Sequence, residues 1–116
     1  MIKLIKSNRV SIKNNSQSCT INEYIFNQPS IGIAQALING RYPTEHDKKV
    51  INCESDIIYF VLGGSGVVHT SADDFMLEPN DALLITHGNW YWVEGNNLKI
   101  LVISSPEWQV VQYKEV

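Results

Sequence analysis

The sequence predicts one domain built only from β-strands, and three observations lead to that prediction. Its 116 residues are enough for one domain and too few for two. The apolar residues alternate with polar ones or form short runs, and turn residues separate the runs. The one helical alternative, over residues 33–38, is short, uncapped and ends at Asn39-Gly40. The pattern is typical of an all-β sandwich or barrel.

The expected strands follow this pattern along the chain. In the N-terminal part, residues 1–38, short strands are expected over 10–12, 20–25 and 31–38. Residues 56–62 form the strongest strand because they are dense in β-branched and aromatic side chains. Glycines at 63–66 then predict a turn, and 95–97 predict a hairpin. Further strands are expected at 67–70, 75–77, 82–85, 90–93 and 98–103.

The composition excludes several classes of protein. Hydrophobic residues make up 44% and charged residues 18%, as in a globular domain. The net charge of −3, with no basic run, argues against nucleic acid as a partner. Lysines interrupt the apolar residues of the first nine positions, so we expect no signal peptide and no membrane segment. Cys19 and Cys53 are therefore expected to be reduced thiols in a cytoplasmic protein.

Two stretches carry motifs at a characteristic spacing. In the first, about residues 40–66, Gly40 and His46 precede a strand that ends at Gly63-Gly64-Ser65-Gly66. In the second, about residues 77–93, Pro79-Asn80-Asp81 leads into an apolar strand and a glycine loop. The pair resembles the two motifs of the cupins. The resemblance implies a cupin-type jelly-roll barrel with a cavity between its two sheets, closed by a C-terminal strand and tail at 98–116.

A subgroup of small cupins without the metal-binding histidines is more similar still. The features shared with it are Gly40-Arg41-Tyr42-Pro43, Asn52, the segment from Trp90 to Asn96, Ser105-Pro106-Glu107-Trp108 and Gln112. This match implies the fold and leaves the activity open.

The metal positions of the cupin motifs are mostly replaced. Lys48 stands at the second histidine position, Ile57 at the glutamate position and Tyr91 at the last histidine position. Asp56 lies beside the glutamate position on the opposite face of the strand. Because only His46 of four expected ligands remains, we expect no divalent metal cofactor and no iron-dependent oxygenase.

Strand alternation indicates which side chains line the cavity. If position 57 faces inward, so do Tyr59 and Val61, and the same reasoning places Tyr91 inward. His46 and Lys48, two residues apart, would share the cavity face of their strand. The candidate ligand-binding residues are Arg41, His46, Lys48, Tyr59 and Tyr91.

Each candidate has a structural alternative. Tyr59 also fits a core tyrosine with its hydroxyl bonded to the backbone, and the simpler interpretation of His46 and Lys48 is that they are solvated surface residues. The guanidinium of Arg41 suits a carboxylate or phosphate ligand, or an ion pair with Glu45 or Asp56. His69 and His87 lie at expected turns and are expected to be solvated.

Three tryptophans suggest an interface. Alternation places Trp90 and Trp92 on the outer face, and outward tryptophans are enriched at interfaces. A homodimer formed by sheet packing would cover them together with Trp108. The alternative is that the C-terminal tail folds back over the outer face through Trp108.

Three functions fit these features. The first is metal-independent binding of a small polar metabolite such as a sugar or sugar acid. The second is a carbohydrate isomerase, epimerase or lyase with His46 as base and Tyr91 or Tyr59 as acid. The third is a scaffold whose cavity is filled by side chains and closed to solvent.

Overall fold

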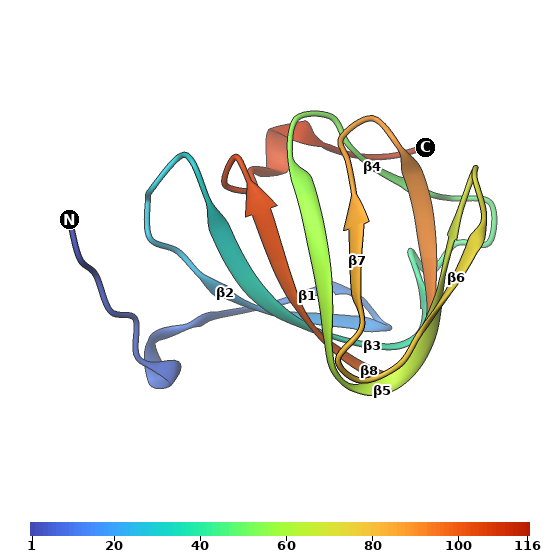
Figure 1. The fold of residues 1–116 in the computed structure, drawn as a ribbon, viewed down its shortest axis with the longest axis horizontal. Coiled ribbons are helices and arrows are strands. Elements are labelled where there is room, and N and C mark those ends of the chain that lie inside the picture. The colour runs from blue at the N-terminus through green and yellow to red at the C-terminus, as the bar shows by residue number, and fades with distance from the viewer.

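The computed structural model describes residues 1–116 and contains nine strands and two short 3₁₀ helices (Figure 1). The strands are β1 (Ser11–Ser16), β2 (Cys19–Tyr24), β3 (Gly32–Tyr42), β4 (Val50–Asn52), β5 (Asp56–Thr70), β6 (Asp74–Leu77), β7 (Ala82–Ile85), β8 (Trp90–Ser105) and β9 (Tyr113–Glu115). The helices are η1 (Ser7–Arg9) and η2 (Val110–Gln112). The prediction of an all-β domain is confirmed. No helix has the length and apolar character needed to cross a membrane.

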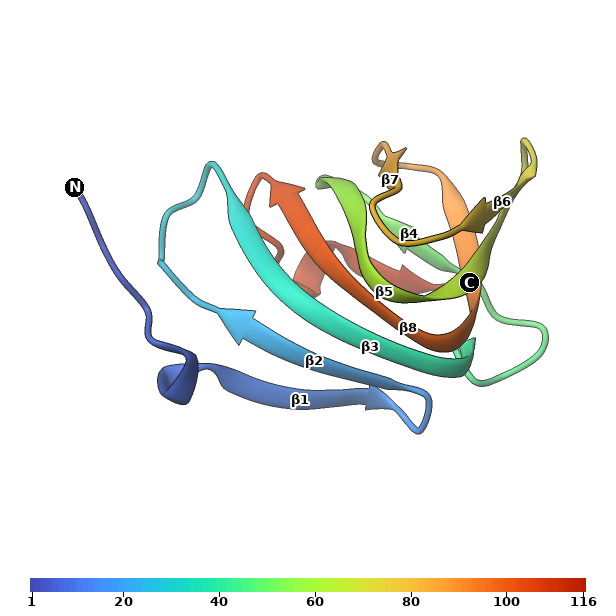
Figure 2. The ribbon, with the colours of Figure 1, turned by 60° about the horizontal axis from the view of Figure 1, so that its bottom comes forward.

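The strands form one strongly curled antiparallel sheet. Its order is β1-β2-β3-β8-β4-β9, and β5 pairs with β6, β7 and β8. The two longest strands, β5 and β8, pair along most of their length and bend together, which brings β4, β6 and β7 over β3 and β8 (Figure 2). The buried core fills the concave side and includes Ile38, Val50, Ile57, Val61, Val68, Val93, Leu98 and Ile100.

The two glycine-rich segments bend strands instead of ending them. The predicted turn at 63–66 and hairpin at 95–97 are both wrong, because β5 and β8 continue through them. The pairing register of β5 shifts on either side of Gly63, and Gly64 has a φ of +72°. A Cβ atom on Gly95 would lie 2.2 Å from the carbonyl oxygen of Ile38. Glycine therefore allows β3 and β8 to approach where the sheet curls.

The other differences concern strand length. β7 covers residues 82–85 as predicted, but β1 extends to Ser16 and β3 to Tyr42. The three-residue strands β4 and β9 were not predicted. They are too short to show an alternating pattern, and they form because the C-terminal tail pairs with residues 50–52.

Candidate functional site

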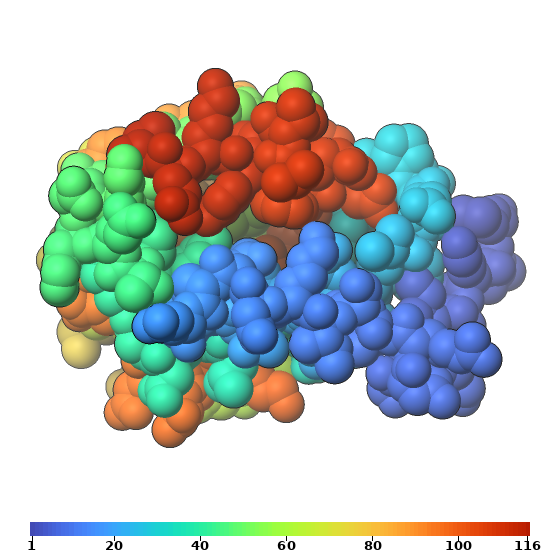
Figure 3. Space-filling model, turned by 180° about the vertical axis from the view of Figure 1, so that it is seen from behind, coloured from blue at the N-terminus to red at the C-terminus, as the bar shows by residue number.

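The concave side of the sheet encloses a cavity of about 340 Å³. It is lined by 25 residues, of which 16 are hydrophobic, so its walls are mainly apolar. The lining comes from β1, β2, β3, β4, β5, β8, the loop between β2 and β3, and the C-terminal tail with β9. Figure 3 shows the hollow from outside, between the segment of β1 and β2 and the tail. Because the cavity is open, the expectation of a filled and closed barrel does not describe this molecule.

A cluster of uncharged polar groups lies on the inner wall. The hydroxyl of Tyr59 donates to the hydroxyl of Tyr91 at 3.3 Å, and the Asn52 amide donates to the same oxygen at 3.4 Å. The rings of Tyr59 and Tyr91 meet edge to face with centroids 6.0 Å apart. Since the Tyr91 oxygen accepts both bonds, its own O–H is free to donate elsewhere. A second phenol pair, Tyr42 and Tyr113, is joined by a hydrogen bond between the hydroxyls.

Burial keeps these groups neutral. Loss of hydration raises the pKa of Tyr91 to about 12, and it also raises the pKa values of Tyr59, Tyr42 and Tyr113 above the usual range of a phenol. Burial likewise raises the pKa of the Cys19 thiol to about 12. At neutral pH the inner wall therefore offers hydrogen bonds without charge, and Cys19 is not a nucleophilic thiolate.

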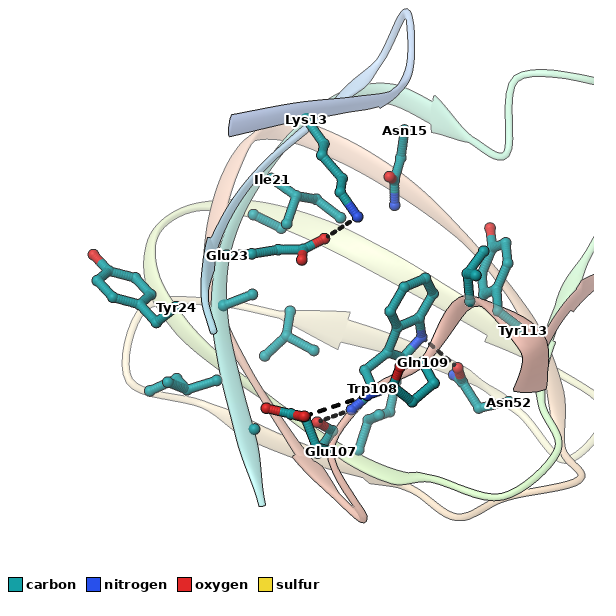
Figure 4. Close-up of a pocket in the computed structure, with 18 of the residues that line it drawn as sticks. Lys13, Asn15, Ile21, Glu23, Tyr24, Asn52, Glu107, Trp108, Gln109 and Tyr113 are labelled. Atoms are coloured by element: carbon teal, nitrogen blue, oxygen red, sulfur yellow. Dashed lines mark hydrogen bonds and ion pairs between the residues drawn. The ribbon is translucent and has the colours of Figure 1, made fainter. Parts of the chain in front are cut away.

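Asn52 connects this cluster to the C-terminal tail. Its side-chain oxygen accepts bonds from the indole N–H of Trp108 at 3.0 Å and from the Gln112 amide at 2.9 Å. The Gln112 oxygen in turn accepts the backbone N–H groups of Ser55 and Glu54 at 3.1 and 3.2 Å. Both Asn52 and Gln112 are buried. The tail is thus fixed to the barrel with the Trp108 ring at the mouth of the cavity (Figure 4).

Charged side chains stand only at the mouth. The Lys13 ammonium lies 2.8 Å from a Glu23 carboxylate oxygen and 5.9 Å from the centre of the Trp108 ring. Figure 4 shows Lys13 and Glu23 on one side of the opening and Glu107 with Trp108 on the other. A ligand would pass an ammonium, a carboxylate and an indole face before it reaches the neutral inner wall.

The structure separates the five predicted site residues into two groups. Tyr59 and Tyr91 line the cavity, whereas Arg41, His46 and Lys48 are not among its lining residues. The expectation that His46 and Lys48 share the cavity face of a strand is wrong, because both lie in the loop 43–49 between β3 and β4.

Arg41 holds this loop in place. Its guanidinium donates to the backbone carbonyls of Glu45, His46 and Lys48 at 3.2, 2.9 and 2.7 Å. It also lies 3.9 Å from the centre of the Trp92 ring. Neither of the expected ion pairs, with Glu45 or with Asp56, forms; all three bonds go to main-chain oxygens.

The other histidines and the outer tryptophans have partners within the chain. His69 lies in β5, 2.7 Å from a carboxylate oxygen of Asp74, and stacks on Trp92 with centroids 3.9 Å apart. His87 lies 2.7 Å from Asp56. Trp92 is therefore covered by Arg41 and His69, and the Lys49 ammonium lies 4.0 Å from the Trp90 ring centre. These contacts remove the reason to place a dimer interface on the tryptophans.

Sequence reasoning missed four residues of the site as functional candidates: Lys13, Glu23, Asn52 and Trp108. Lys13 pairs with Ile21 across the β1–β2 hairpin, and Glu23 is two positions further on. Alternation around the inward Ile21 would have placed both charges on the cavity side, had the hairpin register been known.

The residues of this cavity do not fit a divalent metal, although the cupin fold commonly holds one. The side chains that converge on the inner wall, Asn52, Tyr59 and Tyr91, are neutral and already hydrogen-bonded to one another. Fe, Mn and Zn are held in proteins mainly by imidazole, thiolate or carboxylate ligands, and no group of three or more His, Cys, Asp or Glu residues is close enough to hold an ion.

Comparisons with known proteins show the fold. No protein-family model matches the chain, and no curated protein matches it. Among solved structures, Streptomyces Pac13, described as a nucleoside dehydratase, superposes with a TM-score of 0.86 at 14% identity, covering 100% of this chain and 92% of that one. Variants of it, each with a tyrosine or a histidine replaced, have been solved with uridine.

Two further structures extend this comparison. KdgF from Halomonas sp. has a TM-score of 0.77 at 11% identity, covering 96% of this chain and 99% of that one. Ectoine synthase from P. lautus has a TM-score of 0.70 at 7% identity, covering 89% and 79%. These neighbours are cupin-type barrels, so the predicted cupin-type fold is confirmed.

Proposed function

We propose that this cupin-type barrel binds a small polar ring compound, a sugar, sugar acid or nucleoside, in the cavity beneath Trp108, without a metal. The observation that carries the proposal is the neutral cluster of Asn52, Tyr59 and Tyr91 on the inner wall of a mainly apolar cavity. Ligand sites are characteristically apolar pockets in which a few placed polar groups fix orientation.

The dimensions and chemistry of the cavity fit this class. Its volume of about 340 Å³ lies within the range of small-molecule sites. The free O–H of Tyr91 suits a ligand hydroxyl or carbonyl, and the Trp108 ring suits the flat or C–H face of a ring. At the mouth, the Lys13 ammonium is a partner for the carboxylate of a sugar acid.

The neighbouring structures support a small-molecule ligand. Pac13 is described as a nucleoside dehydratase and has been solved with uridine, and ectoine synthase also acts on a small molecule by its name. Uridine is therefore the first probe for this chain, followed by neutral hexoses and hexuronic acids.

Calorimetric titration with this panel tests the proposal. One compound class should bind, and Tyr91→Phe should weaken its binding roughly tenfold, because one hydrogen bond to the ligand contributes about 1–1.5 kcal/mol. Thr86→Val is the control, since it removes a hydroxyl from an exposed residue of the loop between β7 and β8 that does not line the cavity. If no compound of the panel binds, or if the two variants bind with equal affinity, the cavity is not the binding site.

An elimination reaction is the second candidate, favoured by the ion pair at the mouth. The predicted acid–base pair cannot be His46 with Tyr91, because only Tyr91 lines the cavity. Two carboxylates line the opening, Glu23 and Glu107, and Glu23 is the candidate base because it is part of the ion pair with Lys13. In a lyase the Glu23 carboxylate would accept a proton from the carbon next to a carbonyl of the substrate. A double bond would then form between this carbon and its neighbour. The hydroxyl on that neighbour would leave as water, with a proton donated by Tyr91.

Glu23→Gln separates this reaction from simple binding. If the reaction occurs, the variant should lose turnover by at least about a hundredfold while it still binds the substrate, and His46→Ala should turn over at the wild-type rate. If no member of the panel gains the ultraviolet absorbance of a conjugated double bond, the protein is a binding module only.

A cytoplasmic location and a homodimer remain proposals. Both cysteines are free thiols, Cys19 buried and Cys53 exposed, which suits a reducing compartment.

A further inference from the structure

A second, smaller hollow adjoins the mouth of the cavity, and we call it the side pocket. It encloses about 260 Å³ between the N-terminal segment and the β1–β2 hairpin. Lys6, Arg9 and Ser11 line it, and Glu23 and Ile25 line both the side pocket and the cavity. Figure 3 shows the N-terminal segment beside the hairpin that borders the cavity opening. Because the two spaces share residues, a group attached to a ligand in the cavity would reach the side pocket beside Glu23.

The local structure of the N-terminal segment brings two cations to the side pocket. In the single turn of η1, the Arg9 amide donates to the Lys6 carbonyl at 2.9 Å. Side chains three residues apart lie above one another in a 3₁₀ turn, so Lys6 and Arg9 line the same space. The segment is held to the barrel where the Lys3 ammonium donates to the carbonyl of Phe26 at 3.3 Å.

Neither of these cations has a charged partner in the chain. All the ion pairs involve other basic residues, so Lys6 and Arg9 remain unpaired. Glu23 is the first acidic residue of the sequence, and four of the nine lysines and arginines precede it. This end of the molecule is therefore positive although the net charge of the chain is −3. A local positive potential of this kind attracts anions.

The charges around the side pocket match a dianion. Glu23, the one carboxylate that lines it, lies 2.8 Å from the Lys13 ammonium, so its charge is offset at the cavity mouth. Lys6 and Arg9 then leave two positive charges for a ligand. A phosphate monoester carries a charge of about −1.5 to −2 at neutral pH, whereas a carboxylate carries a single charge. The planar guanidinium of an arginine binds two phosphate oxygens at once, and a lysine adds a point charge.

We infer that the side pocket holds the phosphate group of a phosphorylated ligand, a nucleoside phosphate or a sugar phosphate, whose ring lies in the cavity. Arg9 provides the two-pronged contact to the phosphate oxygens, and Lys6 provides the second cation. This inference rests on the proposed binding of a ring compound beneath Trp108, and it narrows the ligand class from rings in general to their phosphate esters.

Calorimetric titration with matched pairs of compounds tests the inference. The pairs are uridine with uridine 5′-monophosphate and glucose with glucose 6-phosphate. In the pair that binds, the phosphate ester should bind at least about tenfold more tightly than its parent, because hydrogen bonds to charged groups are the strong ones. Arg9→Gln should remove most of this difference and leave the affinity for the parent unchanged. Arg9 is exposed, so the variant should keep the fold.

Lys99→Gln is the matched control for the loss of one positive charge. Lys99 is an exposed residue of β8 that lines neither the cavity nor the side pocket, so this variant should keep the full difference between ester and parent. Equal affinities of the wild type for ester and parent, or a difference that survives Arg9→Gln, would overturn the inference.

A nuclear magnetic resonance titration with inorganic phosphate separates this inference from the proposed function. Phosphate should shift the side-chain Nε–H signal of Arg9 in a saturable way, and sodium chloride at equal ionic strength should not. If phosphate shifts this signal while no ring compound binds, the phosphate site stands and the proposed function fails. If a ring compound binds while the Arg9 signal stays fixed in phosphate, the proposed function stands and the phosphate site is overturned. If neither is observed, both fail.

Discussion

At the scale of single residues, hydration and hydrogen bonding decide what each polar group in the cavity can do. Asn52 is buried, but its side-chain amide donates to Tyr91 and its side-chain oxygen accepts from Trp108 and Gln112, so both its nitrogen and its oxygen have hydrogen-bond partners. Buried polar groups are tolerated when they are satisfied in this way. The phenols beside it lack any cationic partner, so burial keeps them protonated and makes the inner wall a neutral surface.

The phenol cluster predicts how stability depends on alkaline pH. The pKa of Tyr91 is raised to about 12 in the folded chain, whereas an unfolded tyrosine ionises at about 10. Below about pH 10 the stabilisation is fully present, and it is lost as pH rises towards the folded value. Urea unfolding between about pH 8 and pH 11 should show a falling free energy of unfolding, with a shallower fall in Tyr91→Phe. If the free energy of unfolding falls equally steeply with pH in the wild type and in Tyr91→Phe, the raised pKa of Tyr91 is contradicted.

At the scale of elements, two long strands carry both halves of the molecule. β5 and β8 each pass through a glycine-rich bend, and the two strands pair with each other both before and after it. Each strand therefore contributes to the sheet on both sides of the bend. Glycines were correctly identified as special in the sequence, but they were interpreted as chain reversals. A local pattern cannot distinguish a turn from a bend, because only the pairing of β5 with β8 on both sides of it shows the difference.

This interpretation of the bends gives a paired test. Gly95→Ala should lower the free energy of unfolding by about 3 kcal/mol, because the new Cβ would lie 2.2 Å from the Ile38 carbonyl oxygen and neither backbone can move freely. Gly63→Ala should change it by less than about 1 kcal/mol, since no atom lies within 4 Å of its added Cβ. Denaturant unfolding measures both. Similar losses in the two variants would show that close approach is not the reason for glycine at position 95.

The C-terminal tail is the second element on which the site depends. Gln112→Ala removes the side chain that joins Asn52 to the backbone of Ser55 and Glu54. It should destabilise the chain by about 2–3 kcal/mol and speed hydrogen exchange at residues 113–115, where β9 pairs with β4. Gln109→Ala, on the exposed part of the tail, is the control and should leave exchange unchanged. If the amides of β9 exchange slowly in both variants, the pairing of β9 with β4 alone holds the tail in place.

At the scale of the whole molecule, the sequence predicted the architecture better than the site. Alternation placed Tyr59 and Tyr91 inside, because both lie on long, regular strands. It misplaced His46 and Lys48, because loop 43–49 has no alternation to follow. The tail lies far from Asn52 in sequence, so the contact that brings Trp108 to the cavity depends on tertiary packing that no local pattern contains.

The most direct test of the central claim, that the cavity beneath Trp108 is the binding site, is a nuclear magnetic resonance titration of the isotopically labelled chain with uridine, neutral hexoses and hexuronic acids. The account predicts that at least one class shifts the indole N–H signal of Trp108 and the side-chain amide signals of Asn52 in a saturable way, while loop 43–49 stays unchanged. Signals that stay fixed for every compound, or shifts confined to the loop that carries His46, would contradict it.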